Sequence, residues 1–137
     1  MTSEAPVTDH RNAFGTVPFT RLLGVRREFS HAGRARFVLD PRPELENMIQ
    51  ATHGGVLATL LDIAMASAAV SKVDFTMTAV TLSMNSSFLL PGRGRLTADG
   101  EMLAGDADIA SCRACVVDEA GRLVAQAQGS FRYLPHR

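Results

Sequence analysis

The pattern of apolar and polar positions divides the chain into a polar start, two regions of short strands and one long apolar helix between them. Residues 1–14 are mostly polar and show no periodicity, so we predict a mobile tail there and a single domain over residues 15–137. Pro18 and Gly24 bracket a short apolar run. This run is predicted to be a short helix, because proline suits a first helical turn and glycine a helix end.

Two strands and a break follow this short helix. Residues 25–30 and 34–39 have strand-like composition with a turn between them, which predicts a hairpin. Pro41 and Pro43 then end the sheet, because neither proline can donate a hydrogen bond to a strand ladder. A loop is expected from there to His53.

The longest apolar run covers residues 56–71 and carries a single charge, Asp62. Its length approaches that of a membrane span, but Asp62, the hydroxyl side chains and the many alanines favour a buried core helix. On a helical wheel Val56, Leu57, Leu60, Ile63 and Val70 share the side expected to face a sheet, while alanines surround Asp62. A helix that is apolar all round must be covered on both sides, which favours a two-fold dimer.

Strand-like segments fill the rest of the chain: residues 77–90, 95–103, 108–117 and 122–134. Short glycine-containing connections join them, so we expect consecutive strands to pair antiparallel without crossovers. The predicted class is α+β, with the apolar helix lying across the concave face of one sheet of about five strands.

Charge and cysteine content narrow the partners. Lys+Arg and Asp+Glu are 14 each, so no net field attracts the chain to nucleic acid or to a membrane, and we expect neither as a partner. Cys112 and Cys115 lie on opposite faces of a predicted strand, which argues against a zinc or redox site. With no apolar leader in the sequence, we expect a cytoplasmic protein.

Polar groups that suggest chemistry gather at the start of the long helix. His53, Gly54 and Gly55 come immediately before it. A helix N-terminus presents unpaired N–H groups and partial positive charge, and glycines there let a substrate approach the backbone closely. Such a terminus suits a carbonyl oxygen that becomes an oxyanion. Asp62 is costly to bury in an apolar helix unless it is paired or used.

The pattern Asn47-x5-His53-Gly54-Gly55-x6-Asp62 resembles the hotdog-fold acyl-CoA thioesterases. It is most similar to the phenylacetate-degradation (PaaI-type) branch of the 4-hydroxybenzoyl-CoA thioesterase-like superfamily, over about residues 17–135. The resemblance implies an antiparallel sheet wrapped around one central helix. It also implies a homodimer with shared active sites, commonly paired into a tetramer. The loop of one subunit would face Asp62 of the other.

The resemblance further implies residue roles. The Gly54 N–H would polarise the thioester carbonyl, and Asp62 would activate water as a general base or attack the carbonyl directly. Asn47 and His53 would shape the loop and help to bind or activate the thioester, and Thr81 would orient water. The expected substrate-binding residues are Gly55, Met65, Phe88, Arg93 and Arg95, the two arginines as candidates for the phosphates of coenzyme A. Neither a metal nor a cofactor is required.

The leading hypothesis is therefore hydrolysis of an aryl- or medium-chain acyl-CoA. The turn at residues 105–108 is acidic, where many relatives carry a basic residue near the nucleotide of coenzyme A. That departure leaves an acyl-carrier-protein adduct open as the alternative carrier. A non-catalytic acyl-CoA-binding protein and a hotdog hydratase or dehydratase are the alternative functions.

Overall fold

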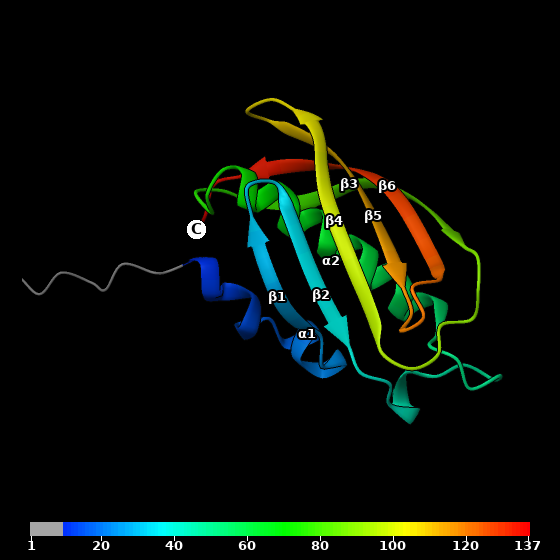
Figure 1. Ribbon diagram of the computed structural model, residues 1–137. Helices are drawn as coiled ribbons and strands as arrows, with labels where there is room; N and C mark the ends of the chain where they lie inside the picture. The colour runs from blue at the N-terminus through cyan, green and yellow to red at the C-terminus, as the bar shows by residue number, and fades with distance from the viewer. Residues whose placement is uncertain (1–9) are drawn as a thin grey trace, which may run out of the picture.

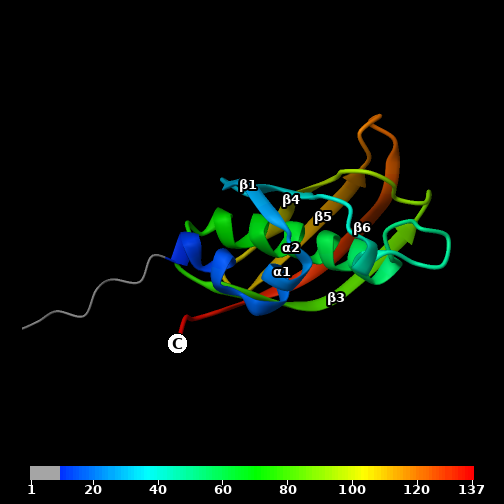
Figure 2. The same ribbon diagram turned by 90° about the horizontal axis from the view of Figure 1, so that it is seen from below.

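One curved antiparallel sheet wraps around a single long helix, α2 (Figure 1). The computed structural model describes residues 10–137. Seen from below, β1 and β4 lie on one side of α2 and β3 lies on the other (Figure 2). The predicted α+β class and the sheet wrapped around one central helix are confirmed. The elements in chain order are η1 (His10–Thr16), α1 (Pro18–Leu23), β1 (Arg26–His31), β2 (Arg34–Leu39), η2 (Pro43–Leu45), α2 (Gly54–Lys72), β3 (Thr78–Phe88), β4 (Leu96–Gly105), β5 (Ile109–Val117) and β6 (Leu123–Leu134).

The sheet has six strands in the order β1-β2-β4-β5-β6-β3, one for each of the six strand-like segments of the sequence. Pairing of consecutive strands is confirmed for β1 with β2, β4 with β5 and β5 with β6, but it is wrong for β3 with β4. β3 pairs instead with β6 at the far edge, and β2 pairs with β4. Residues 89–95 carry the chain across, and Pro91 within them cannot donate to a ladder.

α2 packs on the sheet through only part of the face that the wheel indicated, namely Leu57 and Leu60. Its core face consists of small and medium side chains that are almost fully buried: Leu57, Leu60, Leu61, Ala64, Met65 and Ala68. Val56, Ile63 and Val70 are only half-buried. The reason is the close approach of α2 to β4, where bulky side chains at the centre of the contact would hold the two backbones apart.

The N-terminal segment is more ordered than the sequence indicated. Residues 10–14 belong to the 3₁₀ helix η1, and the Phe14 ring lies 4.8 Å from the Phe37 ring, centroid to centroid. The remainder of the expected tail, residues 1–9, lies outside the described residues. The predicted helix at Pro18 is confirmed, and Gly24 ends it with a left-handed φ of 76°.

Two smaller expectations are also settled by burial. Of the helices in residues 10–137, α2 alone is long and apolar enough to cross a membrane, and its packing inside the sheet makes it the core helix. Cys112 is buried on the inner face of β5 while Cys115 is half-buried on the opposite face, as expected. Burial raises the pKa of the Cys112 thiol to about 11, so this side chain stays protonated and inert.

Candidate active site

The loop that leads into α2 is shaped by Asn47. The Oδ1 atom of Asn47 accepts hydrogen bonds from the N–H groups of Ile49, at 3.0 Å, and of Ala51, at 3.1 Å. Its own N–H donates to the Ala51 carbonyl at 2.8 Å. This local network replaces a helix or strand ladder and holds Gln50 in the left-handed region, at φ 57°. The expected loop-shaping role of Asn47 thus has a physical basis.

His53 caps the helix and leaves one backbone donor open. Its Nδ1 atom accepts from the Gly55 N–H at 2.9 Å, so the neutral ring carries its proton on Nε2. No group in residues 10–137 accepts the Gly54 N–H. A Cβ added to Gly54 would meet nothing within 4 Å. The positive end of α2 therefore presents the Gly54 N–H into open space.

Asp62 lies half-buried on α2 and is oriented by the edge strand β3. The Thr81 hydroxyl donates to the Asp62 Oδ1 atom at 2.5 Å. Thr81 pairs with Phe131 in the sheet register and so points to the same inner face, toward α2. The hydroxyl bond fixes the carboxylate and leaves its second oxygen available to water. The structure thus brings Asp62 and Thr81 together, a contact that the sequence did not predict.

The two groups of polar residues do not meet within one chain. Gly54 and Asp62 are eight residues apart on α2, which is about 12 Å at a rise of 1.5 Å per residue. A carbonyl carbon and the water that attacks it lie about 3–3.5 Å apart. Within one chain, the loop with its open N–H and the carboxylate with its threonine are therefore two separate groups.

The predicted substrate-binding residues differ in their exposure. Gly55 is exposed beside His53, and the side chain of Phe88 is half-exposed at the end of β3. Met65 has no exposed surface, and its methyl group lies 3.3 Å from where a Cβ on Gly129 would stand. The expectation that Met65 lines the substrate site is therefore wrong. Its thioether fills space between α2 and β6.

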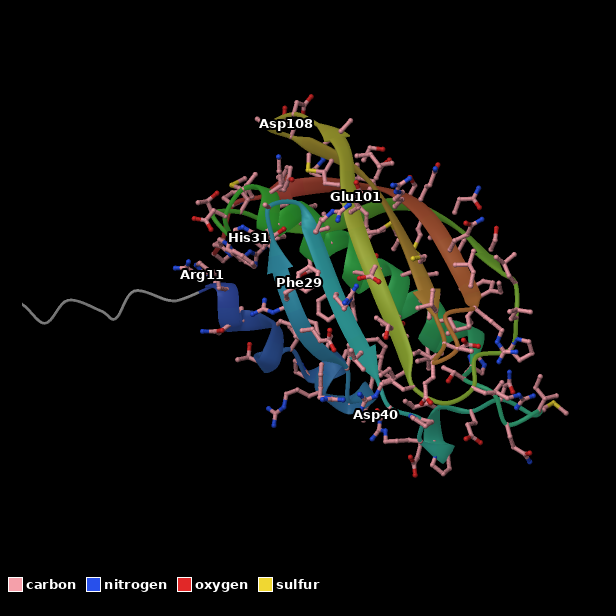
Figure 3. The ribbon with its side chains drawn as sticks, in the orientation of Figure 1. Arg11, Phe29, His31, Asp40, Glu101 and Asp108 are labelled. Atoms are coloured by element: carbon pink, nitrogen blue, oxygen red, sulfur yellow. The ribbon has the colours of Figure 1, made fainter. Side chains whose placement is uncertain are left out.

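Both arginines expected to bind phosphate already have partners. Arg93 donates through Nη1 to the carbonyl oxygens of Ile49, at 2.9 Å, and Gln50, at 3.0 Å. Arg95 Nε lies 2.7 Å from Asp40 Oδ1, and this bond raises the pKa of Arg95 and lowers that of Asp40. Figure 3 labels Asp40 at the end of β2. A phosphate would have to share or displace these partners.

An apolar cavity beside the helix start was not predicted. It has a volume of about 570 Å³, within the usual range for small-molecule sites. The feature of the sequence that could have indicated it is the pair Phe19 and Leu22 in the short helix α1. Their side chains remain 52% and 70% exposed in the structure. The lining side chains come from α1, the loop through η2 and the first turns of α2: Phe19, Leu22, Leu23, Arg42, Glu44, Leu45, Glu46, His53, Gly55, Val56 and Thr59.

A second hollow, of about 700 Å³, lies on the outer face of the sheet. It is lined by paired charges, including Glu101, labelled in Figure 3, which lies 3.0 Å from Arg113. This face is turned away from α2, and none of the candidate catalytic residues lines it. The cavity beside His53 is therefore the one that matters for chemistry at the helix start.

Comparison with known proteins identifies the class. A model of the thioesterase superfamily matches residues 50–125. This range is more than half of the chain and contains His53, Gly54, Asp62 and Thr81. The chain belongs to the thioesterase superfamily. Within that superfamily it is a hotdog-fold protein of the PaaI type, as its structural relatives indicate.

Three solved structures illustrate the relationship. A thioesterase family protein from Silicibacter pomeroyi superposes with a TM-score of 0.86 at 22% identity, covering 93% of this chain and 96% of that one. The PaaI protein of the E. coli phenylacetic acid degradation operon gives 0.82 at 24%, with 88% and 87% covered. A single-site variant of PaaI from Thermus thermophilus gives 0.77 at 30%, with 86% and 100% covered. A search of curated proteins found no significant match.

Proposed function

We propose that the protein is a cytoplasmic acyl-CoA thioesterase whose active sites form between two subunits. The observation that carries the proposal is the separation of about 12 Å along the helix axis between Gly54, with its open N–H, and Asp62 of the same helix. Each site would combine Asn47, His53 and Gly54 of one subunit with Asp62 and Thr81 of the other. We further propose that two such dimers form a tetramer.

The edge strand β3 supports a dimer of this kind. Among the strands of residues 10–137, β3 pairs only with β6, so its other edge has no strand partner within this part of the chain. Val80 and Leu82 on this strand are 43% and 50% exposed. Pairing with β3 of a second copy would continue the sheet and protect that edge. Thr81 lies on the same strand and holds Asp62, so the carboxylate would stand close to the subunit boundary.

The proposed reaction uses these groups as donor and base. The thioester oxygen accepts the Gly54 N–H, which stabilises the negative charge that develops on it. Asp62 takes a proton from water, and the water oxygen bonds to the carbonyl carbon. The carbon–sulfur bond then breaks, and the thiolate leaves with the proton from Asp62. Direct attack by the Asp62 carboxylate on the carbonyl carbon would instead break the carbon–sulfur bond, release the thiolate and form a mixed anhydride. Addition of water to the Asp62 carbonyl of this anhydride would release the acid, so a single turnover in ¹⁸O-labelled water would place one labelled oxygen in Asp62 itself.

The apolar cavity beside His53 is proposed to hold the acyl group. Phe19, Leu22 and Val56 give it a largely hydrophobic wall. Gly54 lies between His53 and Gly55, which both line the cavity, so a carbonyl held by its N–H would place the acyl group at the cavity mouth. Such a wall favours an aryl ring or a medium alkyl chain over a charged acyl group.

Free-thiol release over a panel of aromatic, short, medium and long acyl-CoAs tests the function directly. We expect turnover of at least one aryl- or medium-chain thioester. Binding of acyl-CoA without thiol release across the panel would favour a non-catalytic binding protein. Conversion of an enoyl- or hydroxyacyl-CoA without thiol release would favour a hydratase or dehydratase.

A subunit-mixing experiment tests the shared site. Asp62→Asn and Gly54→Pro each disable one half-site, because proline removes the N–H proposed to bind the oxyanion. A heterodimer of the two variants keeps one complete site, so random co-assembly is expected to restore about a quarter of parental activity. Each variant alone and a mixture of separately purified, non-exchanging dimers serve as controls. If co-assembly restores nothing while heterodimers are detected by mass, the shared site is wrong.

Narrowing the cavity tests the acyl assignment. Val56→Phe adds a ring to the cavity wall and is expected to lower kcat/KM at least about tenfold for the longest accepted acyl chain, while the shortest chain is little affected. Val70→Phe is the matched control, because Val70 is also half-buried on α2 but does not line the cavity. An unchanged chain-length profile in Val56→Phe would place the acyl group elsewhere.

A further inference from the structure

Arg93 bonds to the loop beside the helix start rather than to an acid. Its Nη1 atom donates to the two consecutive carbonyl oxygens of Ile49 and Gln50, at 2.9 and 3.0 Å. Hydrogen bonds from a charged guanidinium are stronger than those between neutral groups. The 43 and 44 residues that separate the partners make these bonds tertiary contacts between two loops.

The bonded carbonyls belong to the strained tip of the loop. Gln50 has a φ of 57°, a left-handed conformation that is unfavourable for a residue with a side chain unless its surroundings enforce it. Asn47 holds the N–H groups of Ile49 and Ala51. Arg93 binds the carbonyl oxygens of the same short segment. Asn47 therefore fixes the loop tip through its N–H groups, and Arg93 fixes it through its carbonyl groups.

Arg93 itself extends from a firmly anchored segment. A Cβ on the preceding residue, Gly92, would stand 3.2 Å from Leu96 and 3.3 Å from Val124, so this backbone is pressed against the core. The Gly92 carbonyl accepts the Thr52 N–H at 2.8 Å. On the other side, the Arg95 N–H donates to Glu119 at 2.9 Å. The loop that carries His53 is thus attached to the core through Gly92 and Arg93 together.

We infer that Arg93 is a positioning residue that sets the direction of the Gly54 N–H through the loop. Gly54 follows Gln50 by four residues, and His53 between them orders the helix start by accepting the Gly55 N–H. A shift of the loop tip would move the donor relative to the thioester oxygen. The inference rests on the proposed thioesterase function and replaces the expectation that Arg93 binds phosphate.

Two thioesters of the same acyl group separate the two roles. Acyl-CoA carries the nucleotide phosphates, whereas the matching acyl N-acetylcysteamine thioester carries none. Arg93→Ala is expected to lower kcat by roughly 10–100-fold on both, by the same factor, because a donor displaced by about 1 Å is costly to catalysis. Arg93→Lys, which keeps the charge and a donor, is expected to recover part of the loss. Arg113→Ala, which removes a guanidinium paired with Glu101 on the outer sheet face, should change neither rate.

Amide hydrogen exchange over residues 46–55 gives a second readout, independent of turnover. We expect faster exchange in Arg93→Ala and parental exchange in Arg113→Ala. A loss confined to acyl-CoA, with parental exchange, would show that Arg93 binds phosphate and would overturn the inference, as would parental rates on both thioesters. If the parent protein releases thiol from neither substrate, the proposed function is wrong. Exchange at the parental rate in Arg93→Ala would show, independently, that Arg93 does not order the loop.

Discussion

Asp62→Asn is expected to lower thioester hydrolysis by roughly 10²–10⁴-fold, the usual contribution of a general base. Asparagine has nearly the same shape as aspartate, and its Oδ1 atom can still accept the Thr81 hydroxyl that lies 2.5 Å away in the parent. What it lacks is the ability to take a proton from water. The loss should therefore appear in kcat, measured by thiol release, with KM little changed.

The same variant is expected to keep its fold and its subunit assembly. Removing a half-buried carboxylate leaves no charge unpaired, so thermal unfolding and the mass in solution should match the parent. Asp74→Asn is the control, because Asp74 is exposed beyond the end of α2 at a φ of 51°, which asparagine tolerates well. Parental turnover by Asp62→Asn would remove this residue from the mechanism and leave the Gly54 N–H as a binding group only.

The elements of the fold follow from local sequence, whereas the contacts between elements do not. The periodicity of apolar residues and the positions of turn residues located the helices and strands closely, since proline and glycine affect the backbone at their own positions. The wrong pairing of β3 and the only partly correct face of α2 both depend on contacts with distant residues. Gly100 is the clearest case. A side chain there would overlap the backbone of α2 at Ala64, which lies 36 positions earlier in the chain.

The candidate site shows the same division. His53, Gly54 and Asp62 were found because their spacing along one loop and one helix is a local property. Met65 was misplaced because hydrophobicity does not say whether a side chain faces the core or a ligand. The partners of Arg93 could not be foreseen either, since a positive charge in sequence suggests an anion, yet its bonds are to backbone carbonyls.

Gly100→Ala is expected to destabilise the fold by about 3 kcal/mol or more, because the added Cβ would overlap the Ala64 carbonyl oxygen. Both the strand at Gly100 and this carbonyl belong to rigid backbone, so α2 and β4 would have to separate. Gly100 lies in a row of small residues that crosses the sheet through paired positions, Ala35, Gly100, Ala114 and Ala127. The middle of α2 packs against this row of small residues.

A loss of that size should lower the midpoint of thermal unfolding by about 10 °C at equal protein concentration. Gly15→Ala is the matched control, because a Cβ there would meet nothing within 4 Å and is expected to change stability by less than about 0.5 kcal/mol. In the proposed dimer, the position of α2 would also set the distance between Asp62 and the loop of the partner subunit. Gly100→Ala molecules that remain folded should therefore lose activity as well, and parental stability and turnover together would contradict the close approach of α2 to β4.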